Sequence, residues 1–146
     1  MQYLKLLISG VLYLFNQPAL AEWQQLDSND QMVIYLDIDN IEYIDQDRRK
    51  IQNLVDFYLP QVAHPNGSQI TFQSFIRNIE VNCDTHRQKT LDIVFYKHTN
   101  ARGEEVYRSQ INADWSEIPR SAGNALLVDL ACAPRTILSL DVLQTF

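Results

Sequence analysis

Apolar residues recur at every second position through most of the central part of this 146-residue chain. The clearest run begins at Ile51, where Val55, Phe57 and Leu59 share one face and polar residues fill the other. A period of two is typical of a strand with one face in a core and the other toward water, the usual arrangement in antiparallel sheets. The alternation therefore predicts an antiparallel sheet.

Other stretches of the chain show the same extended pattern, and residues typical of turns separate them. We expect strands at residues 32–38, 41–44, 51–59, 70–83, 91–96 and 106–111, the last as a short edge strand. The predicted turns lie at residues 45–47, 64–67, 87–90 and 100–103, and Pro60 is expected to end the strand before it. Five or six consecutive strands with short connections predict an antiparallel meander.

The pattern changes to a helical one after Trp115. Pro119 stands where a helix could begin, Ser121 can cap its first turn, and Gly123 weakens its start relative to alanine. Apolar residues then recur at three- and four-residue spacing up to Cys132; they are Ala122, Ala125, Leu126, Leu127, Leu130 and Ala131. The predicted fold class is α+β, with a C-terminal helix packed on the sheet.

The first 21 residues have the three parts of a secretory signal peptide. Lys5 lies near the amino terminus, an apolar run follows from Leu6 to Phe15, and Ala19 and Ala21 form an A-x-A cleavage pattern. The apolar run is too short to cross a hydrocarbon core of about 30 Å comfortably. We predict cleavage between Ala21 and Glu22, which leaves a domain at residues 22–132 and an apolar tail at residues 133–146.

Export places the chain outside the cytoplasm, in the periplasm, on the cell surface or in the medium. No cysteine lies near the predicted cleavage point, so we expect no lipid attachment. Outside the leader we also expect no transmembrane span. The apolar tail at residues 133–146 is interpreted as an added edge strand, a dimer contact or a docking peptide.

The chain holds two cysteines, Cys83 and Cys132. In an exported domain two thiols usually form a disulfide, and closing a loop of about 50 residues stabilises the fold by about 4 kcal/mol in the chain-entropy model. The alternatives are a zinc site and a nucleophilic Cys83 beside His86. Only this histidine lies close in sequence, and no second C-x-x-C or H-x-x-x-H would complete a metal shell.

The charge balance limits the class of partner. The chain carries 12 Lys+Arg and 18 Asp+Glu, a net charge of −6, which argues against a nucleic-acid partner because phosphate binding needs a basic surface. One small basic cluster consists of Arg48, Arg49 and Lys50. It is interpreted either as a solvated hairpin end or as a docking patch for an acidic partner.

Residues that could support catalysis or metal binding are scattered. Residues 27–30 begin like a calcium loop but lack its later glycine and glutamate, so a turn is expected. Asp37 and Asp39 flank a predicted break and have no base nearby, while His64, His86 and His98 fall in turns or strand ends. No nucleophile elbow, P-loop or H-E-x-x-H occurs. We expect no catalytic site, metal or cofactor.

Several segments occur in an order that resembles a known family. They are Trp23, then Tyr35–Asp37, Glu80–Cys83 and Leu91–Tyr96, and last Trp115–Ser121 leading to Cys132. This set resembles the surface-adhesin protein E family of Gram-negative bacteria, over about residues 23–132. The resemblance implies a small antiparallel sheet on a helix with one disulfide, attachment to host extracellular-matrix and serum proteins, and a homodimer. It implies no catalytic residues.

The resulting hypothesis is a non-enzymatic exported module that binds protein through exposed strand edges and loops. An exposed edge can pair with the backbone of a partner and must otherwise be protected. The partner is expected to be a host matrix or serum protein. The alternative is a periplasmic envelope protein that binds a small ligand or another envelope component.

Overall fold

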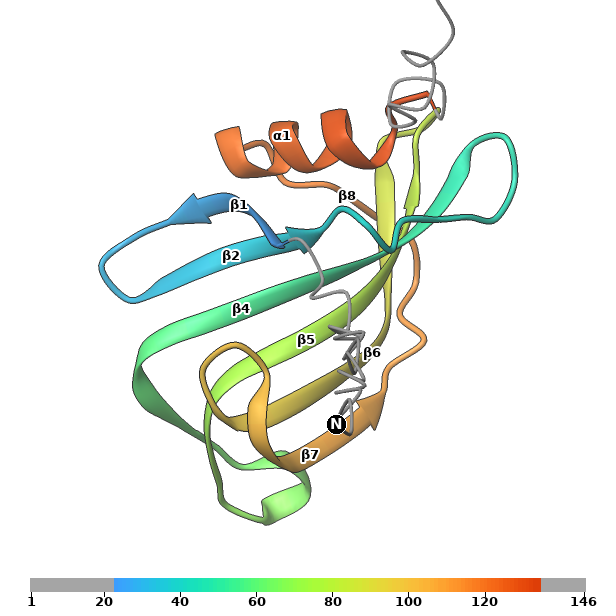
Figure 1. Ribbon diagram of the computed structural model, residues 1–146. Coiled ribbons are helices and arrows are strands. Elements are labelled where there is room, and N and C mark those ends of the chain that lie inside the picture. Colours follow the sequence, from blue (N-terminus) through green and yellow to red (C-terminus); the bar gives the residue numbers. More distant parts are fainter. Residues whose placement is uncertain (1–22, 135–146) are drawn as a thin grey trace, which may run out of the picture.

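The computed structural model describes residues 23–134 (Figure 1). The predicted leader with its cleavage site at Ala21 and Glu22, and the predicted tail beyond residue 134, lie outside the described residues. The elements in chain order are β1 (Trp23–Ser28), β2 (Met32–Asp37), β3 (Glu42–Tyr43), β4 (Arg48–Ala63), η1 (Pro65–Gly67), β5 (Ile70–Asn82), β6 (Arg87–His98), β7 (Arg102–Gln110), β8 (Ser116–Glu117) and α1 (Ala122–Ala131).

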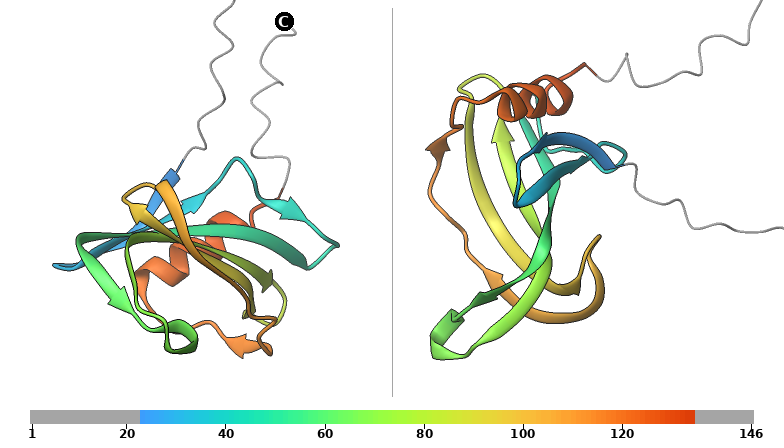
Figure 2. Two further views of the ribbon diagram at one scale, coloured as in Figure 1. Left: turned by 90° about the horizontal axis from the view of Figure 1, so that it is seen from below. Right: turned by 90° about the vertical axis from the view of Figure 1, so that its left-hand side faces the viewer.

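The strands form one antiparallel sheet in the order β1-β2-β4-β5-β6-β7, with β3 on β4 and β8 on β6. The sheet is strongly curved, and α1 lies across one end of it (Figure 2). The predicted antiparallel sheet with a C-terminal helix is therefore confirmed. The predicted count of five to six strands is too low, because residues 23–134 alone form eight.

The two strands absent from the prediction, β1 and β8, lack the period-two signal. In β1 only Trp23 and Leu26 are large and apolar, and a register shift between Gln25 and Asp27 interrupts its pairing with β2. Strand β8 consists of two exposed polar residues that pair with the start of β6. Both strands are defined by hydrogen bonds to a neighbour, which a local apolar pattern does not reveal.

One predicted strand end was wrong, because Pro60 does not end β4. The ladder with β5 is interrupted between Asp56 and Gln61, so the residues between them make no regular pairs with β5. Proline is tolerated at such a bulge because no ladder bond depends on its missing N–H. The side-chain amide of Gln73 instead donates to the carbonyls of Phe57 and Tyr58, at 3.3 Å each.

One predicted turn was also misplaced, because residues 87–90 are the start of β6. The reversal occurs earlier, at residues 83–86. There Asn82 Oδ1 accepts the N–H groups of Asp84 and Thr85 at 3.0 and 2.9 Å, and His86 adopts a φ of 52°. An asparagine side chain that bonds the backbone ahead of it closes a tight turn, which fixes this reversal.

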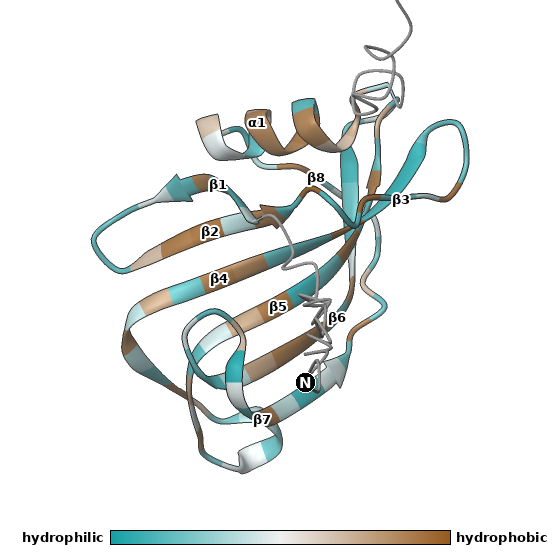
Figure 3. Ribbon diagram, in the orientation of Figure 1, coloured by the Kyte–Doolittle hydropathy of each residue, from teal (hydrophilic) through white to brown (hydrophobic). Residues whose placement is uncertain are grey.

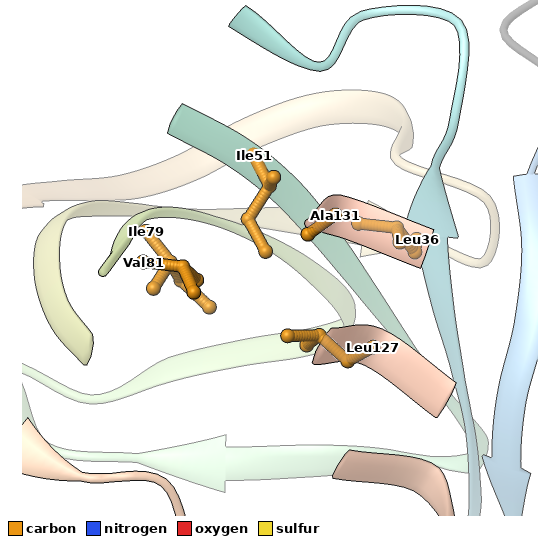
Figure 4. Packing of buried hydrophobic residues seen from close by; sticks show 6 residues of the cluster. All are labelled: Leu36, Ile51, Ile79, Val81, Leu127 and Ala131. Carbon is orange, nitrogen blue, oxygen red and sulfur yellow. The ribbon is translucent and has the colours of Figure 1, made fainter. Parts of the chain in front are cut away.

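The main core lies where α1 meets the sheet. Its buried members come from β2, β4, β5 and α1, and Figure 4 shows their side chains converging; they are Leu36, Ile51, Ile79, Val81, Leu127 and Ala131. All six are at most 2% exposed. Burial of apolar area at this level is the main favourable contribution to folding, at roughly 25 cal/mol per Å².

Helix α1 begins and ends as its sequence predicts. Ser121 caps it by accepting the N–H of Asn124 on its hydroxyl at 3.1 Å, and Cys132 follows its last turn. The predicted apolar stripe needs a correction, because Ala122 and Ala125 are exposed while Gly123 is buried. Gly123 is buried because the first turn of the helix lies against the Asp27 side chain of β1.

The predicted disulfide is confirmed: Cys83 and Cys132 are bonded, with their Cα atoms 5.7 Å apart. Cys83 follows the last residue of β5, and Cys132 follows α1, so the bond fixes the end of the helix to the end of a central strand. Neither sulfur is a free thiol. The alternatives of a zinc site and of a nucleophilic cysteine are therefore wrong for this state.

Candidate functional site

The two edges of the sheet differ in what covers them. Strand β1 lies beside α1 (Figure 1), and the Asp27 side chain packs against Gly123 so closely that a Cβ at this glycine would lie 2.8 Å from Asp27 Cβ. Strand β7 is the last strand at the opposite edge, and within the described residues no strand pairs with its outer side. The open edge of the sheet is therefore β7.

The register fixes which backbone groups of β7 point outward. The pairing with β6 runs without interruption from Tyr107 to Gln110, and the N–H of Ile111 donates to the Leu91 carbonyl at 2.9 Å. In an antiparallel ladder, successive residues point their N–H and C=O alternately toward and away from the neighbour. Since Ile111 and Ser109 point toward β6, the N–H and C=O of Arg108 and Gln110 point away from the sheet.

A row of aromatic rings crosses the sheet and reaches this edge. Neighbouring ring centroids are 5.8 Å apart for Phe57 and Phe72, 4.7 Å for Phe72 and Phe95, 5.5 Å for Phe75 and Phe95, and 6.0 Å for Phe95 and Tyr107. The rings meet edge-on or tilted, the preferred arrangements of aromatic pairs. None of them belongs to the core cluster under α1. The row continues the apolar interior as far as the last strand.

The second half of β4 carries exposed large side chains, and the hairpin that follows it contacts β7. Tyr58, Leu59 and Val62 are 53%, 72% and 56% exposed. The Nδ2 group of Asn66, in η1, donates to the Tyr107 hydroxyl at 3.2 Å and so ties the hairpin end to β7. Tyr58 itself lies beside the β1–β2 connection, where its N–H donates to the Gln31 carbonyl at 3.0 Å, so of these contacts only the one from Asn66 reaches β7.

The open edge is also charged. Arg108 forms a bidentate pair with Glu105, with both N···O distances at 2.8 Å, and the hydrogen bond from Arg108 lowers the pKa of Glu105. Figure 3 shows that β7 is mainly hydrophilic whereas the inner strands carry the apolar residues. Charged side chains on an edge discourage unspecific strand pairing. The charged side chains of β7 therefore protect this edge from unspecific pairing.

Comparison with known proteins identifies the domain. The chain matches the surface-adhesin protein E family over residues 23–133. It belongs to this family. No curated protein and no solved structure matches it. The resemblance seen in the order of sequence segments is thus confirmed, and the match spans every strand and the helix of the described domain.

The predicted basic docking patch of this adhesin E domain, residues 48–50, lies at the start of β4. Arg48 contacts Asp45 at 2.6 Å and Glu80 at 3.1 Å. Glu80 is 6% exposed and also binds Lys89 at 3.1 Å. The charge of Arg48 is thus shared between two carboxylates of its own chain.

The other two cations of the patch also have partners within the chain. Arg49 is buried, its guanidinium lies 4.3 Å from the centre of the Tyr43 ring, and its Nη1 donates to backbone carbonyls of the preceding turn. Lys50 lies 3.5 Å from Glu42. Docking at this patch stays a prediction, and an acidic partner would have to compete with these contacts.

The residues considered for acid–base catalysis and for calcium binding stabilise turns. Asp37 is 2% exposed, and its carboxylate accepts the backbone N–H of Asp39 and Asn40 at 3.2 Å each and the Asn40 side chain at 2.8 Å. In the stretch that begins like a calcium loop, Asn29 Oδ1 accepts the N–H groups of Gln31 and Met32. These carboxylate and amide oxygens fix the backbone of the β1–β2 and β2–β3 connections.

The three histidines occupy three different hairpin connections. His64 precedes η1, His86 lies in the turn before β6, and His98 is the last residue of β6. His86 and His98 are therefore at opposite ends of one strand of twelve residues. This topology does not bring the three imidazoles together.

Among residues 23–134 no group of three or more His, Cys, Asp or Glu side chains is arranged to hold a metal ion. The same residues include no helix that is both long and apolar enough to cross a membrane.

Proposed function

We propose that this member of the adhesin E family is an exported, non-enzymatic protein-binding module that holds an extended segment of its partner along β7. The observation that carries the proposal is the open β7 edge beside the row of aromatic rings that ends at Tyr107. Membership of a surface-adhesin family supports a protein partner.

The edge supplies affinity and the aromatic row supplies selectivity. A partner strand beside β7 would pair with the outward N–H and C=O groups of Arg108 and Gln110, as in other cases of strand addition. Every second side chain of that strand would then lie on the face that carries Tyr107 and Phe95. A partner segment with large apolar side chains at alternate positions fits this surface best.

The partner proposed here is a host extracellular-matrix or serum protein, and the site of action is the cell surface. A second copy of the chain could occupy the same edge, which would give a homodimer and block the partner. An envelope component inside the periplasm is the competing partner. A host protein, a second copy of the chain and an envelope component predict different results for binding, oligomeric state and location.

The central experiment uses a proline at an outward-pointing position. Arg108→Pro removes an outward N–H without removing a hydrogen bond to β6, whereas Arg108→Ala removes the same side chain and keeps that N–H. Purified full-length protein is tested against immobilised matrix and serum proteins by surface plasmon resonance. We expect Arg108→Pro to weaken binding about tenfold or more, equivalent to about 1.4 kcal/mol, and Arg108→Ala to bind like the parent.

The two variants decide between edge pairing and other modes of binding. Circular dichroism first establishes that both are folded. Equal binding by the two variants would contradict strand addition at β7. Analytical ultracentrifugation of the parent shows whether a second copy occupies the edge. Protease treatment of whole cells separates a surface location, which leaves the protein cleavable, from a periplasmic one, which protects it.

A further inference from the structure

A cavity of about 120 Å³ lies between the start of α1 and the sheet, and no residue of β7 lines it. Leu26, Ile34 and Leu127 give it an apolar wall; its polar lining comes from Asp27, Asn53, Arg77, Ser121 and Asn124, with Gly123 at the helix. A cavity that holds a single water has a volume of only about 10–15 Å³. The cavity is therefore large enough for a small molecule.

Arg77 brings a cation to this cavity without a counter-ion. Its Nε atom is buried with no hydrogen-bond partner, and no carboxylate within residues 23–134 forms an ion pair with it. Burial lowers the pKa of the guanidinium, but arginine stays charged in proteins. Arg77 is half-buried and its Nε lies out of reach of solvent without an acceptor, so an anionic group at this place would be favoured.

Asn53, beside Arg77, has a buried acceptor that lacks a donor. Asn53 and Arg77 are paired residues of β4 and β5, and Asn53 is 1% exposed. Its Nδ2 donates to the Tyr35 carbonyl at 3.2 Å, while its Oδ1 has no donor. Buried polar atoms are nearly always hydrogen-bonded. Two neighbouring exceptions, one donor and one acceptor, line the same cavity.

A donor group and an acceptor group also lie side by side where the first turn of α1 contacts β1. The amino terminus of α1, capped by Ser121, has a positive partial charge, and Gly123 of its first turn forms part of the wall. Asp27 lies against that glycine from β1 and is exposed. The cavity lining thus combines donors, from Arg77 and the first turn of the helix, with acceptors, from Asn53 and Asp27.

We propose that this cavity binds a small α-amino acid in its zwitterionic form. The carboxylate accepts from Arg77 Nε, and the ammonium donates to Asn53 Oδ1 and to Asp27, whose carboxylate lies against the first turn of α1. The cavity volume and the walls of Leu26 and Leu127 restrict the side chain to a small apolar one. This site is independent of the β7 edge and of adhesion.

The test is a nuclear magnetic resonance titration of the full-length protein with four probes: glycine, L-alanine, acetate and methylammonium. We expect saturable shifts of the Gly123 amide and the Asn53 side-chain amide with both amino acids. Acetate and methylammonium, which each carry half of the zwitterion, should bind at least about tenfold more weakly. No saturable shift would mean that solvent fills the cavity, and acetate binding as tightly as glycine would mean a simple anion site. Either result overturns the proposal.

Substitutions of cavity residues test whether glycine binds in the cavity. Arg77→Met should weaken glycine binding at least about tenfold, whereas Arg108→Met, the matched change on exposed β7, should leave it unchanged. Asp27→Asn changes an exposed residue at the rim, so it keeps the proposal testable if Arg77→Met fails to fold. It should weaken glycine binding and leave that of acetate unchanged. Glycine binding that is equal in the parent and in Asp27→Asn contradicts the assigned pose.

Discussion

The disulfide is expected to supply a large part of the stability of this domain. It joins residues 49 apart in the sequence and connects the end of β5 to the end of α1. A helix of ten residues has little stability alone, so α1 depends on this bond and on its core contacts. Replacing both cysteines, Cys83→Ala with Cys132→Ala, removes the bond and leaves the apolar contacts largely intact.

The magnitude follows from loop closure. For a loop of this length the chain-entropy relation gives about 4 kcal/mol at 25 °C. Small domains are stable by only roughly 5–15 kcal/mol, so the loss is a large share of the total. For a domain of this size about 1 kcal/mol corresponds to about 4 °C in Tm, which predicts a decrease of about 15 °C.

Thermal unfolding followed by circular dichroism measures this decrease. Four samples are compared: parent and double variant, each with and without reductant. The reduced parent and both samples of the variant should unfold at similar temperatures, well below the oxidised parent. A difference of less than about 5 °C between oxidised and reduced parent would refute the reasoning. It would show that the core alone holds α1 on the sheet.

Three further predictions concern the core, the helix cap and a buried carboxyl. Leu127→Ala should lower the free energy of unfolding by about 2–5 kcal/mol, while Leu59→Ala at an exposed position should change it by less than about 0.5 kcal/mol, both measured by urea unfolding. Ser121→Ala should cost about 1 kcal/mol in the same assay, because the N–H of Asn124 loses its acceptor. Burial raises the pKa of Asp56 above its ordinary value of about 3.9, so the protonated form is the one favoured by folding. The parent should therefore lose stability relative to Asp56→Asn as the pH rises from below about 3.9 through the raised pKa, and a constant difference across that range would contradict it.

Much of the fold was predictable because its signals are local. The period of two in β4 and the central strands reflects one face turned to a core, and the start of α1 is a capping serine followed by an apolar stripe. Pro60 misled the prediction because its effect depends on whether a ladder bond is needed at that place. The bulge that makes it harmless is visible only in the pairing of β4 with β5.

The candidate sites depend on contacts that are distant in sequence. Tyr107 and Phe57 are fifty residues apart in the chain, and only the sheet order places their rings in one row. Arg77 has no local feature that marks it as a cation without a counter-ion. Its pairing with Asn53 under the first turn of α1 creates the unsatisfied cavity.

The sequence by itself determined the family, six of the antiparallel strands, the closing helix and the bond between Cys83 and Cys132. It did so because alternation, capping and cysteine pairing are properties of short segments or of residue counts. Tertiary structure alone decided which edge stays open, which aromatic rings meet and which polar atoms are buried without a partner. These properties depend on register and curvature, which arise only when segments far apart in the chain lie side by side.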